Sequence, residues 1–162
     1  MKHLQFFLIV FIGSLLVGCG PSEASKRLAK FTETHIQKAT TCYTMYSAAN
    51  GYVGPESREQ LIEFFKSEPK MAKRMEMMHL RLSDIDSYFV SPRDGEEYKF
   101  RWKLKKNPKS SPYPIVFEQV GLDGVRLVGV SGAIVEEVED DSVYDDYWNG
   151  KYKRDLLGRE DQ

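Results

Sequence analysis

The sequence predicts an α+β domain in which a long N-terminal helix and two short helices pack on an antiparallel β-meander of about five strands. Two observations carry this prediction. Between residues 22 and 82, apolar side chains recur every three or four positions, which is the spacing of one helical face. After residue 85, apolar and polar residues alternate, and short turn sequences separate the alternating runs. We therefore expect the helices to cover one face of the sheet.

The first predicted helix spans residues 22–49. Its apolar stripe falls at positions 24, 28, 31, 35, 39, 42, 46 and 49, in steps of three and four. Pro21 and Ser22 are typical of a helix start, and Asn50 with Gly51 is typical of a helix end.

Two shorter helices follow in the predicted order. One starts at Ser57, where a serine followed three residues later by Gln60 matches a capping box. Pro69 then interrupts the pattern, which predicts a further helix over residues 69–81. This helix carries a methionine stripe, and such a stripe either fills a core or forms an adaptable groove, of which core filling is the commoner case. The stripe consists of Met71, Met75, Met78 and Leu82.

The second half of the chain reads as five strands. They are predicted at residues 87–90, 97–105, 115–120, 125–130 and 133–138. In the strand over 97–105, aromatic and leucine side chains alternate with lysine and arginine, so one face is apolar and the other basic. Beyond it, residues 139–162 form an acidic and polar tail, expected to be mobile or loosely docked with a short helical turn near residues 144–148.

Residues 1–18 differ from the rest of the chain. Lys2 precedes an apolar run from Phe6 to Val17, interrupted by Gly13 and Ser14. A run of about twelve residues falls short of the roughly 20 needed to span a bilayer, but it suits the central region of a signal peptide. The segment is therefore predicted to be a cleaved targeting peptide. A transmembrane helix, or an ordinary signal peptide with a chance cysteine, is the alternative.

The motif Leu16-Val17-Gly18-Cys19 at the end of this run resembles the lipobox of bacterial lipoproteins. That resemblance implies cleavage before Cys19, lipidation of its thiol and attachment of the protein to a membrane. Gly20 in the next position implies the outer membrane, facing the periplasm, in an organism that has one. The chain then divides into a signal peptide (1–18), a single α+β domain (19–138) and the tail (139–162), and Cys42 has no intramolecular disulfide partner.

A second, weaker resemblance concerns the domain itself. The stretch TCYTMYSAANGYVGPESREQLIEFF, residues 41–65, is similar to the helix end and following segment of pseudopilin-like proteins. This resemblance implies a long helix packed on a small meander, and a component of a secretion or filament apparatus. The sequence lacks the prepilin-type cleavage site and the long apolar first half of the helix that filament assembly requires.

Charge and composition limit the possible partners. The formal net charge is −1, and the sequence contains no nucleic-acid-binding motif, so nucleic acid is not an expected partner. The most basic stretch lies on the predicted strand, where an exposed row of cations could bind lipid headgroups or an acidic envelope protein, or could simply be a solvated face that prevents edge pairing. This row consists of Lys99, Arg101, Lys103, Lys105 and Lys106, extended by Lys109.

Other reactive side chains have ordinary structural explanations. His35 lies on the apolar stripe and His79 near a helix end, Cys42 is expected to be an inert core thiol, and Asp84 with Asp86 suits a turn. The acidic run after residue 135 lacks the spacing of a calcium-binding loop. No catalytic residue, metal or cofactor is predicted. The expected function is a lipid-anchored cell-envelope protein with a non-catalytic binding or scaffolding role; the alternatives are a pseudopilin-like component and an envelope enzyme with an unrecognised site.

Overall fold

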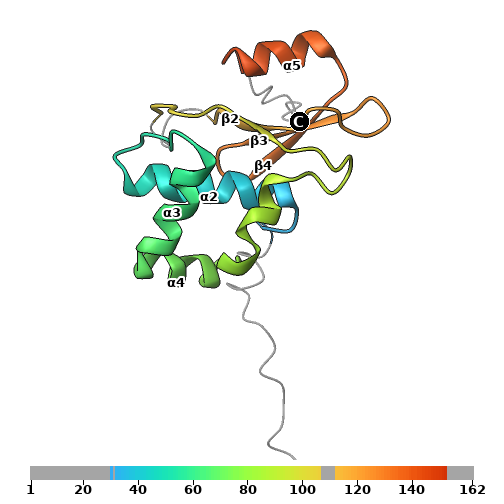
Figure 1. Ribbon diagram of the computed structural model, residues 1–162. Coiled ribbons are helices and arrows are strands. Elements are labelled where there is room, and N and C mark those ends of the chain that lie inside the picture. The colour runs from blue at the N-terminus through green and yellow to red at the C-terminus, as the bar shows by residue number, and fades with distance from the viewer. Residues whose placement is uncertain (1–29, 31, 107–111, 153–162) are drawn as a thin grey trace, which may run out of the picture.

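The computed structural model describes residues 30, 32–106 and 112–152, and it shows a four-stranded antiparallel sheet with helices on both faces (Figure 1). The strands are β1 (Lys99–Phe100), β2 (Pro114–Phe117), β3 (Arg126–Val130) and β4 (Ile134–Val138), in that order across the sheet. The helices are α2 (His35–Ala49), α3 (Arg58–Ser67), α4 (Pro69–Met77), the 3₁₀ helix η1 (Leu82–Phe89) and α5 (Asp141–Trp148). The mixed α+β class is confirmed.

Helix α2 starts later than the predicted helix. Residues 32–34 are not helical, and α2 begins at His35 because Thr34 forms a capping box with Gln37. The Thr34 side chain accepts a hydrogen bond from the Gln37 N–H, and the Gln37 side chain accepts one from the Thr34 N–H. The long helix over 22–49 is therefore wrong for residues 32–34. Residues 22–29 and 31 lie outside the described residues.

Helices α3 and α4 follow the prediction more closely. Ser57 caps α3, where its side chain accepts a hydrogen bond from the Gln60 N–H. Helix α4 ends at Met77 rather than at residue 81, because His79 adopts a left-handed conformation with φ of 58°. The Leu80 N–H then donates to the Met75 carbonyl, and both side chains are buried. This is a Schellman ending in which histidine occupies the position usually taken by glycine.

The sheet has four strands in the described residues, and not five. The strand predicted at residues 87–90 is wrong, because residues 87–89 are the end of η1 and Val90 is its C-cap. The Ser87 side chain donates to the Asp84 carbonyl there, a local bond that competes with strand pairing. The strand predicted over 97–105 is reduced to β1, because the chain turns at Lys103, whose φ is 58°.

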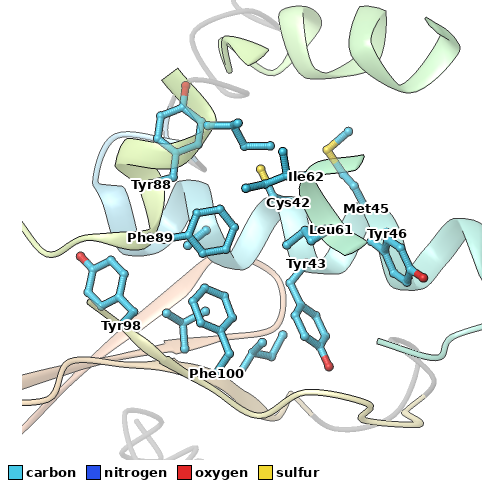
Figure 2. Packing of buried hydrophobic residues seen from close by; sticks show 14 of the residues in the cluster. Cys42, Tyr43, Met45, Tyr46, Leu61, Ile62, Tyr88, Phe89, Tyr98 and Phe100 are labelled. Atoms are coloured by element: carbon cyan, nitrogen blue, oxygen red, sulfur yellow. The ribbon is translucent and has the colours of Figure 1, made fainter. Parts of the chain in front are cut away.

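The main core lies between α2 and the helices and strand around it. Figure 2 shows Tyr43 and Cys42 of α2, Leu61 of α3, Phe89 of η1 and Phe100 of β1 converging there. Nine residues of α2 are buried, so the helix is enclosed on more than its predicted stripe. Gly129 of β3 permits this close approach: a Cβ at residue 129 would lie 2.2 Å from Thr40 Oγ1.

A second core covers the other face of the sheet, where the sequence predicts a mobile or loosely docked tail. Helix α5 lies on the face away from α2 (Figure 1), and its Tyr144 is buried against Phe117 with ring centroids 5.4 Å apart. The Tyr144 hydroxyl donates to the Glu118 carbonyl at 2.7 Å. Residues 139–152 are therefore packed on the domain; residues 153–162 lie outside the described residues.

Candidate functional site

The predicted basic row does not form one uniform surface. Lys103 pairs with Glu56 at 3.3 Å, whereas Lys99, Lys105 and Lys106 are exposed. Arg101 is partly buried, and its Nη1 donates to the Pro114 carbonyl. Burial lowers the pKa of Arg101, but the guanidinium remains charged at neutral pH. The row as a binding site stays a prediction, with two of its five members already holding partners inside the domain; Lys109 lies outside the described residues.

The two carboxylates of η1, Asp84 and Asp86, form hydrogen bonds within the domain. Asp86 accepts a hydrogen bond from Arg58 Nη2 at 2.8 Å, while Asp84 accepts one from the Ser83 hydroxyl at 2.7 Å. Arg58 also binds Glu97 at 2.8 Å and lies over the Phe89 ring. The arrangement is an exposed ion-pair group that joins α3 to η1 and to the start of β1.

Cys42 and His35 are held in structural positions. Cys42 is 1% exposed in the interior of α2, and burial raises the pKa of its thiol to about 12. Such a thiol is protonated at neutral pH and is a poor nucleophile. His35 places Nδ1 3.1 Å from the Val90 carbonyl; because a carbonyl can only accept, Nδ1 carries the proton. His79 is exposed at the end of α4.

The acidic run is spread over β4 and α5. Asp140 caps α5: its carboxylate accepts hydrogen bonds from the Ser142 hydroxyl and from the Ser142 and Val143 N–H groups, and these bonds lower its pKa. Asp141 pairs with Arg126, and Asp146 pairs with Lys151. Among the described residues, no group of three or more histidine, cysteine or acidic side chains is arranged to hold a metal ion.

A buried ion pair between Glu118 and Arg93 was not predicted. The Glu118 side chain is fully buried, and it accepts hydrogen bonds from Arg93 Nη1 at 2.8 Å and from the Ser91 hydroxyl at 2.7 Å. Arg93 and the Ser91 hydroxyl bind different oxygens, and the Leu127 N–H donates at 2.8 Å to the oxygen that also accepts from Arg93. The contacts of Arg93 and Ser91 join the loop at 91–97 to the sheet. With three hydrogen bonds and an ion pair inside the domain, this buried carboxylate holds the loop on the sheet and is poorly placed for acid–base work.

An apolar pocket of about 240 Å³ lies between α2, α4 and the turn that joins β3 to β4. Met45 and Ala48 of α2 form one wall, and another is formed by Arg74 of α4 and by Met78, which directly follows α4. Ala133 closes it from the turn. Part of the predicted methionine stripe thus faces a cavity, while Met75 fills the core with 0% exposure. Because members of one stripe have different roles, their spacing alone could not show whether the stripe forms a groove or fills the core.

The start of the described chain lies beside this pocket. The Thr32 hydroxyl donates to the Met78 carbonyl at 2.9 Å. Gln37 Nε2 lies 3.2 Å from the Lys30 carbonyl and 3.4 Å from the Ala133 carbonyl, so it joins the incoming chain to the pocket's turn. The chain therefore reaches the domain at the C-terminal end of α4.

Arg74 is the charged member of the pocket wall, and it belongs to a basic surface on α4. Lys70, Lys73 and Arg74 are exposed, as is Met77 at 58%. Positions 70, 73, 74 and 77 share one helical face, because residues three, four and seven apart lie above one another. We call these four residues the α4 outer face.

The described part of the chain contains no helix with the length and apolar character required to cross a bilayer. Comparison with protein-family models, with curated proteins and with solved structures finds no significant match to this chain.

Proposed function

We propose that this protein is a lipid-anchored component of the cell envelope, with a domain that binds or scaffolds and does not catalyse. The observation that carries the proposal is the motif Leu16-Val17-Gly18-Cys19 directly after an apolar run of about twelve residues. On this proposal residues 1–18 are removed, and lipid on Cys19 holds the remainder at a membrane.

The arrangement of the domain supports an anchored role. Twelve residues separate Cys19 from Thr32, where the chain is hydrogen-bonded to the domain. A chain of that length reaches at most about 45 Å when fully extended. The lipid would therefore keep the domain within that distance of the bilayer. More than one acyl chain is needed for a lasting attachment, because a single chain holds only marginally.

The chemistry of the described side chains supports binding over catalysis. The buried carboxylate of Glu118 accepts three hydrogen bonds inside the domain, and Cys42 is a protonated core thiol. In contrast, the pocket between α2 and α4 is lined mainly by apolar side chains, with Arg74 at its wall. A concave apolar surface with one cation is suited to holding an amphipathic group.

The anchor is tested by radiolabelled palmitate incorporation in a bacterial host, with Cys19→Ser as the variant and Cys42→Ala as the matched control. We expect label in the parent and in Cys42→Ala, and we expect Cys19→Ser to remain unlabelled at the mass of the unprocessed chain. The mass of the N-terminal peptide should place the lipid on Cys19. Label in Cys19→Ser, or an unlabelled parent, would contradict the proposal.

A further inference from the structure

The α4 outer face gathers positive charge on a domain whose overall charge is slightly negative. Lys70, Lys73 and Arg74 are separated by three and four positions, so their charges lie close together on one exposed face. None of the three forms a salt bridge within the described residues. Arg74, in the last turn of α4, interacts favourably with the helix dipole, but like charges at this spacing repel one another slightly, so the clustering of the three cations does not itself stabilise the fold.

An exposed apolar side chain adjoins these cations. Met77 is 58% exposed at the end of the same face, while Met75 on the opposite side of α4 is completely buried. A short helix with cations and an apolar side chain on its outer face has the composition of a segment that lies at a lipid–water boundary. Such a face can attract anionic headgroups while its apolar side chain enters the interface.

The position of the incoming chain brings this face toward the anchor. Thr32 is fastened to the carbonyl of Met78, the residue that directly follows α4. With lipid on Cys19, the segment of twelve residues would leave the bilayer and join the domain at this point. The tether therefore enters the described domain at the end of α4, beside the α4 outer face.

The distribution of acidic residues favours the same orientation. Helix α5, with Asp140 as its cap and Asp141, Asp145 and Asp146 within it, lies on the far face of the sheet from α2. Helices α3 and α4 lie on the α2 side (Figure 1). Helix α4 itself carries the exposed Glu76 beside its three cations, so its net charge is +2 (three cations and one carboxylate). When α4 approaches a negatively charged surface, the aspartates of α5 are directed away from it, so their repulsion acts only at longer range.

We propose that the α4 outer face contacts the anionic headgroups of the membrane to which Cys19 is attached, and that it fixes the orientation of the domain on that membrane. This inference rests on the lipid anchor proposed above. Each cation near an anionic surface strengthens binding about fivefold, so three of them contribute roughly a hundredfold. The tether makes this contact intramolecular, so a modest attraction suffices to populate one orientation.

The test uses the full acylated protein reconstituted into vesicles, with a fluorescent probe attached at Met77→Cys. The matched control carries the probe at Val120→Cys, a position that is 65% exposed between β2 and β3. Lipid on Cys19 and burial of Cys42 restrict the labelling to the introduced thiol. Vesicles contain phosphatidylcholine alone or with one-third phosphatidylglycerol, and a nitroxide-labelled lipid quenches a probe that reaches the interface.

We expect quenching at position 77 in the phosphatidylglycerol vesicles to be at least threefold stronger than in phosphatidylcholine vesicles or in 0.5 M salt. Salt weakens the contact because charges attract only over about one Debye length, which is about 10 Å at 0.1 M and shorter at higher ionic strength. Quenching at position 120 should stay low throughout. The triple variant Lys70→Gln, Lys73→Gln, Arg74→Gln should lose the difference. The corresponding variant of the basic row, Lys99→Gln, Lys103→Gln, Lys105→Gln, should keep it.

Three results would overturn the proposal: equal quenching at positions 77 and 120, no response to anionic lipid, or loss of quenching in the Lys99 variant and not in the Lys70 variant. A probe at 77 that stays unquenched in every vesicle composition would likewise exclude a lipid contact of the α4 outer face. The mass of the Cys19 peptide reports the anchor separately. Should that residue carry no lipid, sedimentation of the same chain with anionic vesicles still tests the α4 outer face, and the melting temperature of each variant shows whether it is folded.

Discussion

Replacing Arg93 by methionine should destabilise the domain more than its position near the surface suggests. The Glu118 side chain is 0% exposed, and Arg93 supplies the opposite charge at 2.8 Å. Removing the arginine leaves a buried carboxylate with hydrogen bonds from Ser91 and from the backbone of Leu127, but without a countercharge. Breaking a buried pair in this way costs about 3–5 kcal/mol.

The expected magnitude lies at the lower end of that range. The Arg93 side chain is 26% exposed, so water can reach the space that it vacates and partly solvate the carboxylate. We expect a loss of about 3 kcal/mol in the free energy of unfolding. At about 3 °C per kcal/mol for a chain of this size, the melting temperature should fall by roughly 9 °C.

The assay is urea unfolding followed by tryptophan fluorescence, with Lys103→Met as the matched control. Lys103 and Glu56 form an ion pair whose side chains are 62% and 64% exposed, so its loss should cost no more than about 1 kcal/mol. In a Glu118→Gln background the Arg93→Met cost should fall by at least about 1.5 kcal/mol, because no buried charge is then left unpaired. Equal costs in the two backgrounds, or a cost matching that of Lys103→Met, would refute the reasoning.

Three further predictions concern packing, reactivity and pH. Gly129→Ala should cost about 1–3 kcal/mol in chemical unfolding, since the new methyl would lie 2.2 Å from Thr40 Oγ1 and 3.0 Å from Ile36 Cγ1; a cost near zero would show that α2 moves freely from the sheet. In a Cys19→Ser chain, the thiol of Cys42 should react with a disulfide reagent roughly a thousandfold more slowly than a free thiol until urea is added, because burial raises its pKa from 9.0 to about 12; reaction at the free-thiol rate in native buffer would contradict the assigned burial. Burial acts to raise the pKa of Asp94, but hydrogen bonds from the Glu96 and Gly121 N–H groups outweigh it and hold the pKa below its usual value. The carboxylate therefore stabilises the fold at pH values above its unfolded pKa, and this stabilisation is lost as the pH falls through the folded pKa. The parent should therefore exceed Asp94→Asn in stability from pH 5 to 7, with a difference that shrinks below about pH 4; a constant difference down to pH 2 would be evidence against this role.

Local sequence signals predicted the helical half of the fold well where capping residues were present. Ser57 and Pro69 mark the starts of α3 and α4, and both helices begin there. The start of α2 was missed because the apolar stripe runs past Thr34 without a break. Thr34 and Gln37 also form a capping box, and that pair was the signal for the true boundary.

The strand predictions failed where local bonding or backbone strain prevailed over side-chain alternation. Residues 87–90 have strand-forming side chains, yet the hydrogen bond from the Ser87 side chain to the Asp84 carbonyl favours the 3₁₀ helix. No glycine marks the turn at Lys103 in the sequence. The turn is specified by tertiary contacts, such as the hydrogen bond that the Lys103 N–H donates to the Pro55 carbonyl. Alternation still predicted the burial of Tyr98 and Phe100 correctly.

Contacts between residues far apart in the chain could not be predicted from local sequence patterns. Nothing local indicates that Glu118 meets Arg93, because twenty-five residues separate them. One signal did exist for the second core. Residues 115–117 are three apolar residues in succession, which is typical of a strand buried on both faces. That run required a cover on the second face, and α5 provides it.

The covering of the sheet by α5 has a consequence for the order in which the domain becomes complete. Phe117, Val128 and Val130 on that face are made before α5 leaves the ribosome, and they are completely buried in the finished fold. Until Tyr144 and Trp148 pack on Phe117, an apolar sheet surface is open to water and to other chains. The domain can therefore complete its fold only after α5 has been synthesised. A chain that ends before Asp141, through interrupted synthesis or cleavage, would expose this apolar sheet surface and be prone to aggregate.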